Sequence, residues 1–130
     1  MALKLLVIFA GGGVGATLRY LVTMSLQRPD LKAFPWGTLA ANIVGCAVIG
    51  FVMAWIGASE KVKPEVQLAI VVGLLGGFTT FSSFAYEAFR LANADEWTKA
   101  IVYVVVSNVA GIGLAALTYA FATRAFFAQP

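Results

Sequence analysis

Four long apolar windows constrain the fold of this chain more than any other feature of its sequence. They run from about residue 3 to 24, 37 to 57, 66 to 91 and 99 to 123. Each is long enough for an α-helix to cross a bilayer, which takes about 20 apolar residues. The chain is 61% hydrophobic and 12% charged, and a soluble domain of 130 residues has too little interior to bury so much apolar surface. We therefore predict an all-α integral membrane protein, with residues 1–130 forming one four-helix transmembrane domain.

The residue types that are missing exclude most enzyme chemistry. Histidine is absent, and Cys46 is the only cysteine in the sequence. This excludes His-based acid–base relays, His/Cys metal sites and an intramolecular disulfide. Nine Lys and Arg against six Asp and Glu give a net charge of +3. Because the basic residues lie mostly at the ends of the windows, they indicate anchoring to membrane lipid and no nucleic-acid partner. We expect no enzyme activity.

The basic residues are divided almost evenly between the two ends of the predicted bundle. One end carries Lys4, Lys61, Lys63 and Arg124, and the other carries Arg19, Arg28, Lys32, Arg90 and Lys99. The positive-inside rule therefore gives almost no orientation. Two interpretations stand about even on charge alone. Either the chain inserts both ways and pairs as an antiparallel, dual-topology homodimer, or something other than charge orients it. Small residues at four-residue spacing favour close helix packing, within one copy or between two.

The third window carries the strongest local signal, Gly73-Leu-Leu-Gly-Gly-Phe-Thr-Thr-Phe-Ser-Ser-Phe84. Two adjacent glycines weaken a helix, and a run of hydroxyl side chains follows them. Unwound backbone at membrane depth is tolerated only where it is buried in protein or lines a water-filled cavity. We predict that this helix is broken at Gly76–Thr80, where free carbonyls can bind a cation. A plain glycine kink is the alternative.

Polar side chains also lie inside the other windows. Asn42 has Thr38 one turn before it on the same helix face, and Tyr103 and Ser107 share a face in the fourth window. Such residues either join two helices or line a pathway. Arg19 lies inside the first window, where it either reaches an aqueous vestibule and attracts anions or extends to the lipid headgroups.

An aromatic pair and a polar stripe follow the predicted break. Phe81 and Phe84 share one helix face, and Thr80, Ser83 and Glu87 form a stripe beside them. Aromatic rings are positive at their edges, so ring edges beside hydroxyl donors suit a small anion that must shed water. Packing against lipid or core is the alternative for the phenylalanines. Glu87 is nearer the end of the window, where a carboxylate is either hydrogen-bonded or reaches the interface.

These residues match stretches of the Fluc (CrcB) fluoride channel family, which the chain resembles over its whole length. The matching stretches are Gly11–Tyr20, Gly37–Gly45 and Gly76–Phe84 with Glu87. The third is highly specific, whereas the first alone would be weak. The resemblance implies a fluoride-selective channel in the bacterial inner membrane that exports fluoride passively and relieves its toxicity. It also implies an antiparallel, dual-topology homodimer with two pores.

The family pattern gives each candidate residue a role. Phe81 and Phe84 would form an aromatic box, Asn42 would be a donor in the pore, and Arg19 would draw anions into the vestibule. The polar pathway would further involve Thr38, Thr80, Ser82, Ser83, Tyr103 and Ser107, with Glu87 beside it. A structural sodium ion would lie at the dimer centre, on the backbone carbonyls of Gly76 and Thr79.

The second hypothesis is a small dual-topology multidrug/proton antiporter, which also uses four short helices and an antiparallel dimer. That mechanism needs a membrane-embedded carboxylate in the first helix. The first window here has Arg19 and no Asp or Glu. A third hypothesis, a membrane subunit that transports nothing, does not explain why hydroxyls gather after Gly76 and Gly77.

Overall fold

A computed structural model of the chain describes residues 1–59 and 61–127, and the regular structure in these ranges is helical. The elements are α1 (Ala2–Leu26), α2 (Trp36–Ala58), α3 (Pro64–Gln67), the π-helical stretch η1 (Leu68–Leu75), α4 (Gly76–Phe78), α5 (Phe81–Asn93) and α6 (Trp97–Phe127). Within the described ranges, four helical segments are long and apolar enough to cross a membrane, namely α1, α2, α6 and the run from α3 to α5. The all-α, four-helix part of the prediction is confirmed. Each segment is slightly longer than its sequence window.

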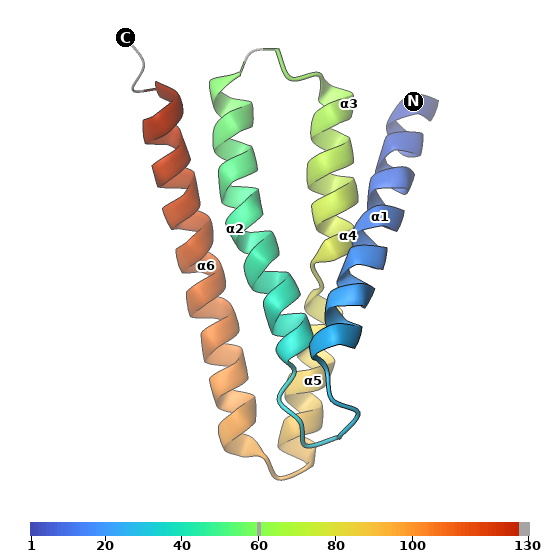
Figure 1. Ribbon diagram of the computed structural model, residues 1–130, viewed down its shortest axis with the longest axis vertical. Helices are drawn as coiled ribbons and strands as arrows, with labels where there is room; N and C mark the ends of the chain where they lie inside the picture. Colours follow the sequence, from blue (N-terminus) through green and yellow to red (C-terminus); the bar gives the residue numbers. More distant parts are fainter. Residues whose placement is uncertain (60, 128–130) are drawn as a thin grey trace.

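The four segments run up and down through the bundle (Figure 1). The start of α1, the end of α6 and the α2–α3 connection lie at one end, and the α1–α2 and α5–α6 connections lie at the other. The run from α3 to α5 is called the third segment below. α2 lies between α6 and the third segment and packs along α6, while α1 packs along η1 and α4. α2 also contributes more buried residues than any other described helix. It is therefore the most buried of the four segments.

Glycines let α1 and the third segment approach each other to backbone contact. A Cβ atom on Gly15 or Gly11 would collide with a backbone carbonyl of η1, and one on Gly73 would lie 3.0 Å from the carbonyl oxygen of Ile8. No larger residue fits at such a crossing, which is how small residues at four-residue spacing join helices in lipid. This part of the small-residue pattern is therefore used inside one copy of the chain.

A small core lies at the end of the bundle where α5 packs between α2 and α6. Leu39, Leu91 and Tyr103 are its central side chains, and the latter two have no exposed surface. Large apolar side chains elsewhere point outward, for example Phe9 at 80% and Ile112 at 70% exposed. Helices with an apolar outer surface are what a bilayer stabilises, since lipid and not water is then their solvent.

The glycine crossing predicts opposite effects for two neighbouring substitutions in α1. Gly15→Ala should lower stability by about 1–3 kcal/mol, because the added methyl group has no space and the backbones must separate. Gly13→Ala is the matched control, since nothing lies within 4 Å of a Cβ at that position. It should be neutral or slightly stabilising, because alanine favours helix over glycine. Thermal unfolding in detergent measures both, and equal melting temperatures would contradict the close crossing.

Candidate functional site

The third segment is interrupted between α4 and α5 at two threonines. Thr79 (φ −89°, ψ 158°) and Thr80 (φ −152°, ψ 121°) both have extended backbones. The N–H and the hydroxyl of Thr79 each donate to the carbonyl of Leu75 at 2.9 Å, which closes the first helix. The hydroxyl of Thr80 accepts a hydrogen bond from the N–H of Ser83 at 3.2 Å and so caps the start of α5.

The glycine pair lies just before this interruption and is itself helical. Gly76 and Gly77 belong to α4, and the extended residues are the two threonines that follow. Threonine hydroxyls compete with the helix for backbone groups, so they favour helix ends over helix interiors. The local backbone therefore depends on the hydroxyl residues as well as on the glycines.

Asn42 of α2 pairs with the backbone of Thr80 through two hydrogen bonds. Its Nδ2 donates to the Thr80 carbonyl at 3.0 Å, and the Thr80 N–H donates to its Oδ1 at 2.8 Å. An extended residue within an apolar segment would otherwise leave both backbone groups without a partner, at a cost of about 1–3 kcal/mol each. A side-chain amide from another helix thus satisfies both groups of the extended residue.

The aromatic pair and the hydroxyls follow at the start of α5. The ring centroids of Phe81 and Phe84 are 5.6 Å apart, and Phe81 is 79% exposed. The Thr80 hydroxyl lies 3.3 Å from the Ser82 oxygen and 3.1 Å from the Ser83 oxygen. Aromatic edges and hydroxyl groups therefore lie within one turn of helix.

Glu87 is the centre of a second polar cluster, further along α5. Thr38 of α2 donates to its Oε1 at 2.9 Å, and Tyr103 of α6 donates to its Oε2 at 2.8 Å. Thr38 is 2% exposed and Tyr103 is fully buried. Both carboxylate oxygens thus have partners within the protein. The cluster adjoins the aromatic pair, because the rings of Phe84 and Tyr103 lie 5.2 Å apart.

A pocket of about 420 Å³ opens beside the interruption, between α2, the third segment and α6. Its polar lining consists of Asn42, Thr79, Thr80, Ser107 and Asn108, with Cys46, Phe81 and Phe84 among the other lining residues. The lining contains no charged side chain. The Ser107 hydroxyl is buried and has no hydrogen-bond partner among the described residues. Amide groups, hydroxyl groups and two aromatic rings thus line the pocket without a charged side chain.

The structure divides the predicted site residues into three groups. The pocket lining contains seven of them: Asn42, Gly76, Thr79, Thr80, Phe81, Phe84 and Ser107. Thr38 and Tyr103 meet at Glu87, and Ser82 and Ser83 contact the Thr80 hydroxyl. Arg19 lies apart from all of these. Its Nε donates to the Gly77 carbonyl at 3.1 Å, so this arginine also joins α1 to the end of α4.

Sequence reasoning did not single out every residue that the structure places at the site. Asn108 is adjacent to Ser107 in the fourth window, where the same two interpretations applied to it, and it lines the pocket. No sequence signal marked the Leu75 carbonyl, which accepts both bonds from Thr79, because every residue has a carbonyl. Among the residues with described coordinates, no group of three or more His, Cys, Asp and Glu side chains could hold a metal ion.

Comparison with known proteins gives one family and many relatives. The family model described as "CrcB-like protein, Camphor Resistance (CrcB)" matches residues 6–119. A protein of Phocaeicola vulgatus named fluoride-specific ion channel FluC is 43% identical over 84% of this chain and 89% of its own length. Proteins of the same name from Hydrogenobaculum sp. and Aquifex aeolicus are 39% and 40% identical, over 86% and 87% of this chain and 91% and 94% of their own lengths.

The pairing between Asn42 and Thr80 predicts that Asn42→Leu exposes the interruption. The substitution keeps the branching of the side chain at Cγ but leaves the N–H and carbonyl of Thr80 unpaired, so stability should fall by about 2 kcal/mol or more. Hydrogen–deuterium exchange of peptides covering residues 79–83 should become faster. Asn108→Leu is the control, because that amide donates to Val104 of its own helix at 2.7 Å. Unchanged exchange in Asn42→Leu would contradict the role given to the pairing.

Proposed function

Because the chain belongs to the CrcB family, we propose that it is a fluoride-selective ion channel of the bacterial inner membrane, through which fluoride leaves the cytoplasm passively and its toxicity is relieved. The chain is a multi-pass membrane protein of a channel family and not an enzyme. The observation that supports the proposal most directly is the uncharged, donor-lined pocket beside the interrupted helix.

Selectivity for fluoride would come from replacing its water shell with fixed donors. An asparagine amide carries two N–H groups, and the described bond from Asn42 to Thr80 uses one of them. The hydroxyl of Ser107 and the edges of Phe81 and Phe84 add further positive contacts in the same pocket. An ion must bind well enough to enter and weakly enough to leave, and a lining without fixed positive charge meets the second condition.

The polar groups outside the pocket would extend the pathway. Thr38, Glu87 and Tyr103 are joined by hydrogen bonds and adjoin Phe84, so they continue the line of polar groups along α5. Arg19 of α1, whose guanidinium contacts the Gly77 carbonyl in α4, would attract anions, since a partly buried cation raises their local concentration.

An antiparallel homodimer would complete the pore. In one copy the pocket lies open beside Phe81, a large ring that is 79% exposed. Apolar rings are normally covered, and a second copy in the opposite orientation would cover this one and close the pocket into a pathway. The near-equal distribution of basic residues between the two ends permits both insertions.

A sodium ion would brace the centre of that dimer on the backbone carbonyls of Gly76 and Thr79. The Thr80 N–H donates to Asn42 and not to the Gly76 carbonyl four residues earlier, which removes a helical partner from that oxygen. Thr79 is extended, so its carbonyl leaves the helical direction, and Gly76 is exposed. Carbonyls of unwound membrane helices are established sodium ligands. The ion would supply positive charge that holds the interrupted helices together.

The antiporter hypothesis gains no support from the structure. α1 contains Arg19 and no carboxylate that could exchange a proton for a cation. Glu87 of α5 has hydrogen bonds to both of its oxygens, from Thr38 and Tyr103. We therefore put forward no second function.

Fluoride efflux from proteoliposomes tests the proposed function. Vesicles loaded with potassium fluoride should release it rapidly, whereas vesicles loaded with chloride should not. Phe81→Ile should slow fluoride release by roughly tenfold or more, which corresponds to about 1.4 kcal/mol of barrier. Phe89→Ile is the control, because Phe89 lies on the same helix, is exposed and does not line the pocket. Equal chloride release, or no fluoride release, would refute the channel.

The same efflux assay tests the sodium site when sodium is replaced by N-methyl-D-glucamine on both sides of the vesicle. Fluoride release should then slow and recover when sodium is restored. A rate independent of sodium would reject the site at Gly76 and Thr79 without affecting the channel proposal.

Labelling of single cysteines tests dual topology. In a Cys46→Ser background, Leu31→Cys marks the α1–α2 connection and Ser59→Cys marks the opposite end of the bundle, and neither substitution changes the charge. An impermeant maleimide applied to intact cells should label about half of each variant, because the copies insert both ways. Complete labelling of one variant and none of the other would show a single orientation.

A further inference from the structure

A second pocket, of about 710 Å³, lies at the end of the bundle where the α1–α2 and α5–α6 connections meet. It shares no lining residue with the pocket at the interruption. Its rim carries Arg28 and Lys32 of the α1–α2 connection and Lys99 of α6, with Asp30 as the acidic residue in the lining. The proposed channel function uses none of these residues.

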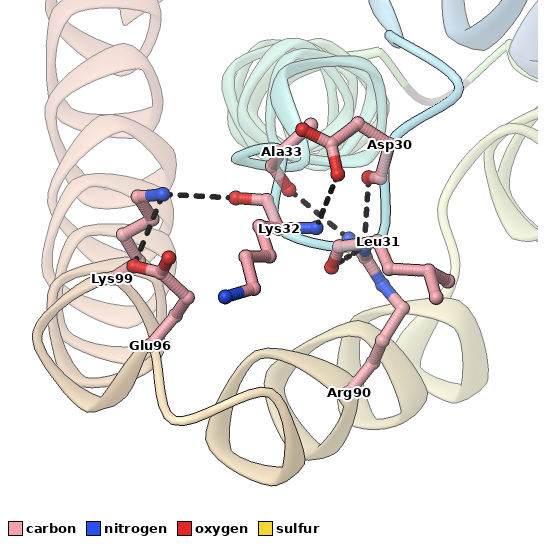
Figure 2. Close-up of polar contacts among 7 residues, drawn as sticks. All are labelled: Asp30, Leu31, Lys32, Ala33, Arg90, Glu96 and Lys99. Carbon is pink, nitrogen blue, oxygen red and sulfur yellow. Dashed lines mark hydrogen bonds and ion pairs between the residues drawn. The ribbon is translucent and has the colours of Figure 1, made fainter.

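The α1–α2 connection at the rim is held by hydrogen bonds to four of its backbone carbonyls (Figure 2). The guanidinium of Arg90, from α5, donates to the carbonyls of Asp30 and Ala33 at 3.1 Å each, and also to that of Leu31. The ammonium of Lys99 donates to the Lys32 carbonyl at 2.9 Å. The backbone of the connection is therefore fixed from two helices, α5 and α6.

Some charged side chains of the rim have a partner within the protein and others have none among the described residues. Lys99 forms an ion pair with Glu96 at 3.1 Å, and the Asp30 carboxylate accepts the backbone N–H of Lys32 at 2.9 Å. Arg28 and Lys32 have exposed side chains and form no ion pair within the part of the chain that the structure describes. Figure 2 shows the Lys32 ammonium reaching into the space between the two connections, without a contact drawn to it. Two cationic groups are thus available to an anion.

The wall of the pocket below this rim is apolar. Leu39, Ala40 and Ile43 of α2 line it, together with Trp36, which is 58% exposed. From residue 36 to residue 43 the helix rises about 10 Å, which is a wall along the membrane normal. Tryptophan is typical of the headgroup level, and basic pockets between helices bind anionic headgroups. A soluble anion would need the rim alone, whereas a phospholipid uses both the rim and the wall.

We propose that this pocket is a binding site for an anionic phospholipid, whose phosphate contacts Arg28 and Lys32 and whose acyl chain lies along Leu39, Ala40 and Ile43. Charge complementarity at the rim and the apolar wall beneath it select this occupant. The bound lipid would brace the connection that Arg90 and Lys99 hold. The site does not depend on the channel function, since it shares no residue with the pathway.

Native mass spectrometry of the protein in non-ionic detergent tests the site with phosphatidylglycerol and phosphatidylcholine as probes. Phosphatidylglycerol should be retained in preference to phosphatidylcholine. The double variant Arg28→Gln/Lys32→Gln should lower its retention roughly tenfold, as expected for losing two basic residues at an anionic headgroup. Lys61→Gln/Lys63→Gln is the matched control, because it removes the same charge from exposed residues at the opposite end of the bundle. It should retain the lipid.

Three results would overturn the proposal. The first is equal retention of the two lipids, and the second is an equal loss in both double variants, which would indicate an effect of net charge. The third is a rise in melting temperature with inorganic phosphate as large as that with phosphatidylglycerol, which would indicate a free anion. The melting temperature of each variant without lipid checks its folding, and the single variants Arg28→Gln and Lys32→Gln, each with a smaller expected loss, provide the test if the double variant unfolds.

Discussion

The pairing of one side-chain amide with one extended backbone residue is the interaction on which the rest of the site depends. Asn42 pairs with both the N–H and the carbonyl of Thr80, so an apolar segment can contain this extended residue without leaving its two backbone groups unpaired. The interruption frees the helix to restart with Phe81, and its cap places the hydroxyls beside the ring. Without Asn42, both backbone groups of Thr80 would lack this partner inside an apolar segment.

Two further polar side chains near the site also have their partners on another helix. Glu87 is held by Thr38 and Tyr103, and Arg19 donates to the Gly77 carbonyl. Glycines in α1 and the third segment allow the backbones to come close enough for such contacts. Few large side chains therefore lie in the interior of the bundle. Hydrogen bonds between helices supplement its small apolar core.

Much of the fold and of the site could be predicted from the sequence, for identifiable reasons. The apolar windows marked the four segments, because length and hydropathy alone decide what can cross hydrocarbon. Polar residues within those windows marked Asn42, Ser107 and Glu87 as candidates, because such residues are costly in lipid and need partners. The partners themselves could not be assigned. The π-helical stretch Leu68–Leu75 and the extended pair after the glycines also had no local signal that fixed their bounds.

The sequence by itself determined that the chain crosses a membrane with four helices, and it determined which side chains inside them are polar, because these properties belong to single residues and short windows. Only the tertiary structure decided how those side chains pair, since Asn42 lies 38 residues from Thr80 and Thr38 lies 49 from Glu87. It also decided that Arg28 and Lys32 line a pocket with an apolar wall, and that Arg90 of α5 holds the α1–α2 connection through the Ala33 carbonyl. Contacts at such separations depend on how helices pack, and no local pattern encodes that packing.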